Sequence, residues 1–571
     1  MSRNSFFSEN YNRKKVLVLV PHQDDEINVA GNLIYTMSKQ GADIYVVYST
    51  NGDYQTDAEI RIKEAFKSLH ILGIPKENII FMGYGDSYNT CEEKHISEVE
   101  EGTVESNAGH RETYCTDTVN EFAFTRRGEH SRYNRGEYCK DLKEIILTIL
   151  ADLIVCVDFD QHPDHRWLSL AFDEVMSQIL HRSNNDYLPQ VLKKFAYANA
   201  FCAPDDIRSI NLRGTQRPNK NNTLNYLRDI IDYGNWMWNE RVRIPVHEDL
   251  RINFLIKRNL LVKAMMAHKS QFMALRAGRI INSDEVFFER RTDSISYRAD
   301  ITVSTGDKKY IDDFKYIGIK DIKSKYPYFD DYLWIPDQND REKSITFDWK
   351  NPQSIRVINL YFGISEKFVH RFAVKMDDGF YKEYRCESAE IKRIDTGLHE
   401  EIRRLSIIIL DSDIDAGISE VEIFSSAEYK RLIKPYIKIV LDGNFAYDEL
   451  IETSSKGCSI DVYSYGCENL DVEIETDKGI MIQNGKVYWN KKIKKFHIKA
   501  KISDDVYDEV IVQNNKMHGN YVEFAQKIDR LWISKFKICE SLHRWKTYVI
   551  EQGMVTTVLR LVEKLNGARK Q

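Results

Sequence analysis

The sequence predicts a multidomain protein: an α/β domain built on a parallel sheet, all-β sandwich modules behind it, and a helical C-terminal tail. Three observations predict this class. The chain has 571 residues, more than one hydrophobic core usually supports. Short apolar runs alternate with helical patterns up to about residue 290, which is typical of parallel sheets covered by helices. From about residue 294 the apolar residues recur at every second position, as in half-buried β-strands.

The first region, residues 1–295, shows the strand–helix alternation. Residues 16–20 and 153–157 are short, purely apolar runs, as expected of strands buried on both faces. Residues 57–72 and 141–150 have helical spacing. Further strands are expected at residues 44–49 and 79–82, and a further helix between the first strand and Gly41. These segments together indicate a Rossmann-like, doubly wound domain.

The second half of the chain divides into three parts. Residues 300–426 alternate in the manner of a β-sandwich, and residues 430–512 read as a small β domain of short strands and glycine turns. Residues 518–571 return to helical spacing and form an amphipathic tail.

Composition excludes several classes of protein. Apolar residues make up 42% and charged residues 29%, which excludes wholesale disorder and fibrous repeats. The net charge of -6 argues against a general nucleic-acid-binding surface. No apolar run approaches the ~20 residues that span a bilayer. The nine cysteines form no CxxC pair, and no secretory signal is recognised, so we expect reduced thiols in a cytoplasmic protein.

Two polar clusters carry the chemistry. His22, Asp24 and Asp25 follow the strand at residues 16–20, and residues 158–165 follow the strand at residues 153–157 in the same way. Ligand sites in open α/β sheets lie at this edge, and His and Asp are typical ligands of Zn²⁺. Each cluster alone is more often the capped start of a helix or a surface turn than a metal site. Two clusters at equivalent positions favour one shared metal ion.

These residues resemble a known family. Residues 21–26 are similar to the Ala-His-Pro-Asp-Asp-Glu signature of the LmbE/PIG-L-type zinc-dependent de-N-acetylases, and residues 162–165 match that family's His-Pro-Asp-His. The resemblance extends over about residues 14–290. Further family-like marks are residues 50–53, 81–86 and 267–271.

The resemblance implies a role for each residue of the two clusters. One zinc ion per chain would be held by His22, Asp25 and His165. Asp24 would act as general base on the zinc-bound water. His162 would stabilise the oxyanion, and Asp164 would orient a histidine.

Some positions are less specific or depart from the family pattern. Arg61 and Asp86 are candidates for gripping sugar hydroxyls, with a helix-surface Arg and a turn Asp as the equal alternative. Pro21 and Gln23 replace the family's Ala and Pro but supply no ligand. Asp160 stands where some relatives carry a Tyr that assists the oxyanion, so that role is unassigned.

A long polar insertion at about residues 85–138 interrupts the α/β pattern. We interpret it as a substrate-covering lid in which Tyr133 and Arg135 shape a sugar pocket. Its Cys and His residues match no common ligand spacing, so a structural zinc site there is the less favoured hypothesis. His268, outside the insertion, is expected to be a buried, hydrogen-bonded histidine.

The β-sandwich and the tail each have two interpretations. The sandwich weakly resembles discoidin-like, galactose-binding-like modules, in which Trp334 and Tyr328 could be glycan platforms, although core positions are favoured. From residue 511 onward the chain has 11 basic and 5 acidic side chains, a net of +6. Such a tail could contact an anionic membrane, although helices packed on the enzyme are favoured.

The sequence thus predicts a zinc-dependent hydrolase that removes the N-acetyl group from an N-acetylglucosamine-type sugar, glycoconjugate or lipid-linked glycan. One alternative is a non-catalytic glycan- or surface-binding protein with a decayed enzyme domain, and another is a metal-dependent amidase acting on a non-sugar amide. No nucleic-acid partner is expected. The protein would reach the inner face of the membrane peripherally if its tail binds lipid.

Overall fold

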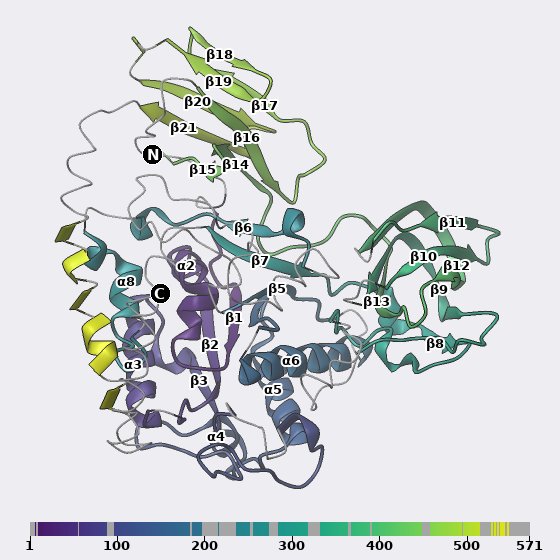
Figure 1. Ribbon diagram of the computed structural model, residues 1–571, viewed down its shortest axis with the longest axis horizontal. Coiled ribbons are helices and arrows are strands. Elements are labelled where there is room, and N and C mark those ends of the chain that lie inside the picture. The colour runs from purple at the N-terminus through teal and green to yellow at the C-terminus, as the bar shows by residue number, and fades with distance from the viewer. Residues whose placement is uncertain are drawn as a thin grey trace, which may run out of the picture.

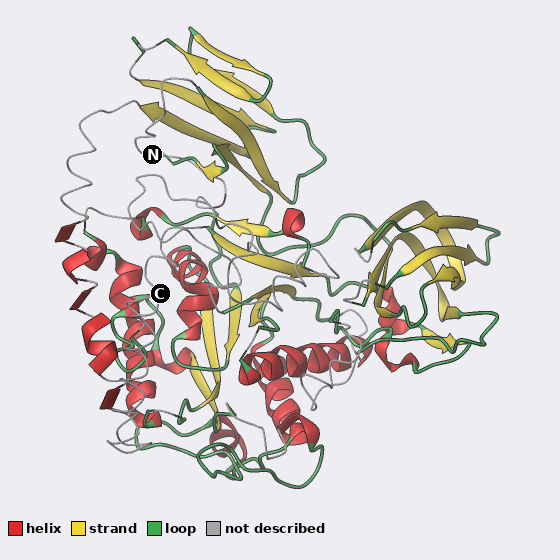
Figure 2. Ribbon diagram, in the orientation of Figure 1, coloured by secondary structure: helices red, strands yellow, loops and turns green. Residues whose placement is uncertain are grey.

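The computed structural model describes residues 6, 9–54, 56–87, 96–160, 162–182, 186–196, 215, 236–251, 255–272, 284–317, 332–363, 367–388, 391–447, 457–490, 492–493 and 495–513, and scattered positions between 527 and 546. Figure 1 shows the α/β domain with one β domain above it and another beside it. Figure 2 shows that the helices gather in the α/β part. Among the described helices, none is long and apolar enough to cross a membrane.

A seven-stranded sheet forms the centre of the α/β domain, in the order β3-β2-β1-β4-β5-β7-β6. Its strands are β1 (Lys15–Val20), β2 (Asp43–Thr50), β3 (Ile79–Tyr84), β4 (Leu153–Val157), β5 (Gln190–Lys194), β6 (Val242–Ile244) and β7 (Glu285–Arg290). The first five are parallel, which confirms the predicted parallel sheet, although β5 was not among the expected strands. β7 and β6 are antiparallel additions at one edge, so the sheet is mixed rather than purely parallel.

Helices cover both faces of this sheet. They are α2 (Asp25–Lys39), α3 (Ala58–Ile71), α4 (Phe122–Arg127), α5 (Arg135–Ile149), α6 (Pro163–Arg182) and α8 (Leu260–Met265). Figure 1 shows α3 and α8 on one side of the strands and α5 and α6 on the other. Short 3-10 helices lie at Lys76–Asn78, Ile96–Glu98, Trp238–Glu240, Glu248–Leu250, Ile256–Arg258, Ile295–Arg298 and Lys308–Tyr310.

Local chemistry explains two of the helices. α5 begins at Arg135, earlier than the predicted residue 141, because the Asn134 side chain accepts a hydrogen bond from the Glu137 N–H and caps the helix. α2 is kinked at Ala30. The Glu285 carboxylate of β7 accepts hydrogen bonds at 2.8 Å from the N–H groups of Asn32 and Leu33, which lie just after the kink.

The order of the strands decides where the site lies. β1 pairs with β2 on one side and with β4 on the other. The strands that follow β1 are thus added first on one side of it and then, from β4 onward, on the other. The carboxyl ends of β1 and β4 are therefore adjacent at the switch point, where α/β sheets bind ligands. α2 follows β1 and α6 follows β4, which brings both polar clusters to this edge.

The β-sandwich has its own core. Its strands are β8 (Asp300–Val303), β9 (Ser344–Phe362), β10 (Val369–Met376), β11 (Tyr381–Arg385), β12 (Lys392–Ser412) and β13 (Ile418–Phe424), in the order β11-β10-β12-β9-β13 with β8 also paired to β9. Trp334 is fully buried in this core, and its indole N–H donates to the Thr305 carbonyl. It is therefore a core residue, as favoured, while Tyr328 lies outside the described residues.

The third region forms two small sheets, β15-β14-β16-β19-β18 and β17-β20-β21. Their strands are β14 (Tyr436–Leu441), β15 (Asn444–Phe445), β16 (Cys458–Tyr465), β17 (Glu473–Thr476), β18 (Ile480–Gln483), β19 (Lys486–Trp489), β20 (Lys495–Lys501) and β21 (Tyr507–Gln513). This region is docked on the α/β domain, because Tyr436, Tyr447 and Tyr465 join the core of that domain. The Tyr436 hydroxyl donates to the Arg243 carbonyl beside β7.

Candidate metal centre and active site

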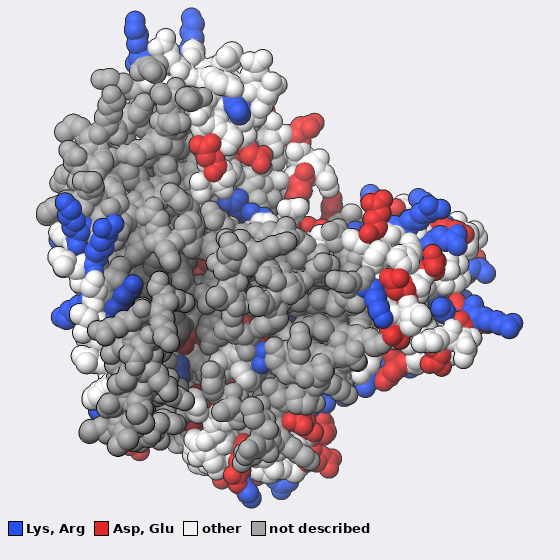
Figure 3. All heavy atoms as spheres, in the orientation of Figure 1, with Lys and Arg blue, Asp and Glu red and all other residues white. Residues whose placement is uncertain are grey.

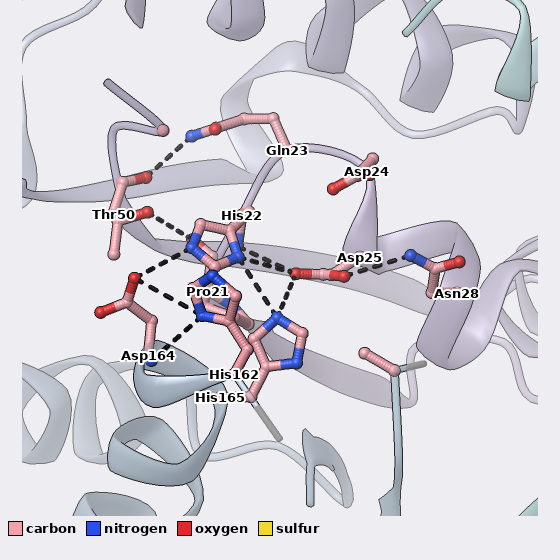
Figure 4. A network of polar contacts seen from close by, with 12 residues as sticks. Pro21, His22, Gln23, Asp24, Asp25, Asn28, Thr50, His162, Asp164 and His165 are labelled. Carbon is pink, nitrogen blue, oxygen red and sulfur yellow. Dashed lines mark hydrogen bonds and ion pairs between the residues drawn. The ribbon is translucent and has the colours of Figure 1, made fainter. Parts of the chain in front are cut away.

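His22 lies in the short loop between β1 and α2, and Asp25 is the first residue of α2 (Figure 4). His162 directly precedes α6, and His165 lies in the first turn of that helix. The loop after β1 is held in place by Gln23, whose side-chain amide donates to the Thr50 carbonyl at the end of β2 at 2.8 Å. Gln23, which departs from the family pattern, is thus an anchor of the loop.

Three donor atoms converge at the centre of the site. His22 Nδ1 lies 3.1 Å from Asp25 Oδ2, His165 Nε2 lies 3.1 Å from the same oxygen, and the two nitrogens are 3.3 Å apart. Ligands of a tetrahedral zinc ion with bonds of about 2.0–2.1 Å stand about 3.3 Å apart. The side chains present therefore fit such an ion, and all three are buried.

Each of these three side chains also forms a hydrogen bond through its other nitrogen or oxygen atom, on the side away from the centre of the site. His165 Nδ1 contacts Asp160 Oδ2 at 2.7 Å, and His22 Nε2 contacts Asp164 Oδ2 at 3.1 Å. Asp25 Oδ1 accepts from the Asn28 amide at 3.1 Å. Such partners fix the tautomer and the direction of metal-binding side chains. Asp164 thus lies where it can orient a histidine, as the family resemblance implies.

The site favours a positive charge. Burial lowers the pKa of His165, but Asp160 and Asp25 outweigh this effect and raise it to about 9. Asp164 and Asp25 likewise raise the pKa of His22 against the effect of burial. Burial raises the pKa of Asp25, yet His165 and His22 together hold it well below its usual range. A divalent cation would supply the charge that the protons supply here.

His162 differs from the other two histidines. Burial and the neighbouring positive charges of His22 and His165 hold the pKa of its imidazole well below the usual value, so the ring is neutral. Its Nδ1 accepts a hydrogen bond from the Asp164 N–H at 3.2 Å, which leaves the proton on Nε2. Its ring lies 4.6 Å from that of His22 in an edge-on arrangement. A neutral N–H donor beside the metal donors is suited to an oxyanion.

Asp24 lies in a strained backbone conformation directly before α2, with φ of 149°. Its N–H donates to Glu26 Oε2 at 2.9 Å, and its Oδ1 lies 3.5 Å from the Arg61 guanidinium. Arg61 is buried and also donates to the carbonyls of Gln23 and Gly52. The described contacts of Arg61 therefore join the loop that carries Asp24 to the segment after β2.

Asp86 lies near Nε2 of the His22 ring, on the side opposite to the Nδ1 atom that faces Asp25. Its Oδ1 is buried 4.0 Å from His22 Nε2, and it has no hydrogen-bond partner among the residues that the structure describes. Asp164, Asp86 and His22 form a second group whose ligand atoms lie within 4.8 Å of one another. Asp86 is thus a carboxylate at the site whose free oxygen can accept a hydrogen bond.

The insertion packs beside the site. Its Tyr133 hydroxyl donates to the Gly85 carbonyl at 2.9 Å and contacts the Ser87 hydroxyl. The Ser87 N–H in turn donates to both oxygens of Asp164. Arg135, in contrast, begins α5 and pairs with Glu174. The structure thus brings Tyr133, but not Arg135, into the network around the site.

Other predicted positions lie apart from the metal donors. His268 is buried and hydrogen-bonded to Glu26 Oε1 at 2.6 Å, as expected. Of the insertion's histidines, His110 lies 3.4 Å from Asp53 and His130 contacts Glu121, while Cys91 and His95 lie outside the described residues. Within the described ranges, the groups that could hold a metal ion are His22 with His162 and His165, and His22 with Asp86 and Asp164, so no Cys or His of the insertion belongs to either group.

Asp160 is the partner that sequence reasoning did not assign. It is fully buried, and besides His165 it accepts hydrogen bonds from the His162 and Ala196 N–H groups. Its position five residues before His165, at the end of a strand, is the signal that could have indicated this role. Asp160 therefore holds a candidate metal ligand, His165, through a hydrogen bond.

The fold and the site together define an α/β enzyme whose histidine and aspartate side chains converge at the carboxyl end of the sheet. Residues 17–176 match the model of a protein family described as PIG-L, GlcNAc-PI de-N-acetylase. This match over part of the chain agrees with the resemblance found in the sequence and supports a de-N-acetylase as the enzyme class. A search among curated proteins gives no match.

Solved structures with similar folds include two deacetylases. One is a triple mutant of the deacetylase of the teicoplanin biosynthetic pathway, 15% identical, with a TM-score of 0.29, covering 49% of this chain and 99% of that chain. Another is N,N'-diacetylchitobiose deacetylase from Pyrococcus horikoshii, 20% identical, with a TM-score of 0.26, covering 50% and 87%. A Streptococcus pneumoniae fucose binding module is 16% identical, with a TM-score of 0.19, covering 23% and 95%.

Proposed function

We propose that this protein is a zinc-dependent hydrolase that removes the acetyl group from an N-acetylglucosamine-type sugar or its conjugate. One observation carries the proposal: the atoms His22 Nδ1, Asp25 Oδ2 and His165 Nε2 lie 3.1–3.3 Å from one another. The family match over residues 17–176 supports the acetamide as the bond that is cleaved. A bound zinc ion would polarise the acetamide carbonyl and make water more acidic.

The side chains around this centre divide the remaining tasks. Asp24 accepts the proton of the attacking water, and Arg61, with its guanidinium 3.5 Å from Asp24, holds that carboxylate in place. His162 donates its Nε2–H to the carbonyl oxygen as negative charge develops there. Asp86 Oδ1 accepts a hydrogen bond from a sugar hydroxyl, since that oxygen is buried at the site and no described residue forms a hydrogen bond with it.

Release of acetate from a panel of acetylated compounds tests the proposal. The panel contains free N-acetylglucosamine, its oligomers, a lipid-linked N-acetylglucosamine and N-acetyl amino acids as non-sugar amides. We expect zinc-loaded wild-type protein to release acetate from at least one of the sugars and to be inactive on the amino acids. Activity confined to N-acetyl amino acids would favour an amidase. Protein that holds zinc but deacetylates no compound of the panel would contradict the proposal.

Variants separate metal binding from chemistry. His165→Ala should lose the zinc, while Asp24→Asn should keep it and lose at least about 100-fold in kcat. His181→Ala is the matched control, because His181 lies at the far end of the same helix α6 and pairs with Asp312. It should keep both zinc and activity. An Asp24→Asn variant with wild-type kcat would exclude Asp24 as the base.

A further inference from the structure

The described positions of the C-terminal tail, which are scattered between residues 527 and 546, are helical, and four apolar side chains among them are exposed. The exposed fractions are 74% for Leu531, 61% for Ile538, 62% for Leu542 and 44% for Trp545. At about 100° per residue, these four side chains fall within a sector of about 60°. We call this set the tail face. Single exposed apolar side chains are common, but a continuous strip of them marks an interaction surface.

Basic residues flank the tail face. Lys527, Lys535 and Lys546 project within about 70° of its centre, whereas Glu540 projects from the opposite side. Over residues 527–546 the sequence has six basic and two acidic side chains, a net of +4. Blue side chains gather in Figure 3 along the left edge of the molecule, where Figure 1 shows this helix in yellow.

Another side of the same helix faces the enzyme. Trp532 is half-buried and packs against the core of the α/β domain. It projects about 100° away from Leu531, so its contact leaves the tail face uncovered. The helix is thus attached to the enzyme on one side and presents apolar and basic side chains on another.

We propose that the tail face binds an anionic membrane surface. Helices that lie in a membrane interface bury an apolar face among the lipids, while flanking lysines reach the head groups and Trp sits at the boundary. Anionic lipids complement the net charge of +4, whereas a second copy of the same helix would bring like charges together. Charge therefore favours a lipid partner over self-association.

Sedimentation of the full-length protein with vesicles tests this proposal. One vesicle contains phosphatidylcholine alone, and the other contains phosphatidylcholine with phosphatidylglycerol. We expect binding to the anionic vesicles at least about tenfold tighter than to the neutral ones, weakening as salt is added. Binding to neither vesicle, or equal binding to both, would overturn the proposal.

Paired variants show whether the tail face is responsible. Ile538→Ser with Leu542→Ser should weaken binding to anionic vesicles at least about tenfold, because the variant lacks two of the apolar side chains that would be buried in the lipid. Lys535→Glu with Lys546→Glu should do the same through charge. Leu398→Ser with Ile414→Ser is the matched control, since these side chains are 58% and 64% exposed on the sandwich.

The control pair should bind vesicles as the wild type does. Two results would overturn the proposal: Ser variants of the tail face that bind as tightly as wild type, or a wild-type dimer that these variants convert into monomers. The readout is lipid binding, so it does not depend on the proposed deacetylation.

Discussion

Replacement of Asp160 by Asn tests whether the metal centre depends on the support behind its ligands. Asp160 Oδ2 accepts hydrogen bonds from His165 Nδ1 at 2.7 Å and from the Ala196 N–H at 3.1 Å, and Oδ1 accepts one from the His162 N–H at 3.0 Å. Either orientation of an Asn amide points its NH₂ group at a donor. The variant therefore loses a hydrogen bond as well as the negative charge that raises the pKa of His165.

The expected loss is about 10- to 100-fold in zinc affinity, the usual effect of removing a partner of a metal-bound histidine. This corresponds to about 1.4–2.7 kcal/mol of binding free energy. Competition with a coloured chelator at equilibrium measures the affinity of the purified variant.

Asp158→Asn serves as the matched control. Asp158 is equally buried and lies two residues earlier, but its partners include Trp236 and Lys193 rather than a metal donor. This control should retain wild-type affinity. The reasoning would be refuted if Asp160→Asn bound zinc as tightly as wild type, or if Asp158→Asn lost as much affinity.

Two further predictions concern Arg61 and pH. Arg61→Met should lower kcat at least about tenfold with little change in KM, because Asp24 loses its positioning partner. Steady-state kinetics measures both constants. A rise in KM with an unchanged kcat would contradict the prediction and indicate that Arg61 contacts the sugar. In metal-free protein, His165 has a folded pKa of about 9, above its ordinary ~6.5. Its contribution to stability, about 3 kcal/mol, is therefore complete below pH ~6.5 and lost as pH rises through 9. Denaturant unfolding after chelation should show this fall, and a constant free energy of unfolding between pH 6.5 and 9 would contradict it.

The strands next to the site could be predicted because their signal is local. Residues 16–20 and 153–157 are continuous apolar runs, and the observed strands are Lys15–Val20 and Leu153–Val157. A run of this kind is stable only where both of its faces are buried. The antiparallel strands β7 and β6, which extend the sheet beyond β5, were not predicted, because their place depends on pairing partners far away in the sequence.

Contacts between residues that are distant in the chain could not be predicted from the sequence. The third region was predicted as a separate small domain, yet its Tyr436 and Tyr465 complete the core of the α/β domain. Nothing in the local pattern marks this, since a buried tyrosine is compatible with either core. The contact between Arg61 and Asp24 could not be predicted either, because the position of Arg61 on a helix does not indicate that its side chain points toward Asp24.

The sequence by itself determined the fold class of the first half, the family resemblance and the identity of the candidate metal donors, because short motifs stand directly after apolar strands. The tertiary structure alone decided the geometry: it brings His22 and His165 within 3.3 Å, although 142 residues separate them. It also placed Asp160 behind His165, fixed the tautomer of His162, and left the tail face exposed. The physical reason is that these properties depend on distance and burial, which arise only when the strands pair and the helices pack.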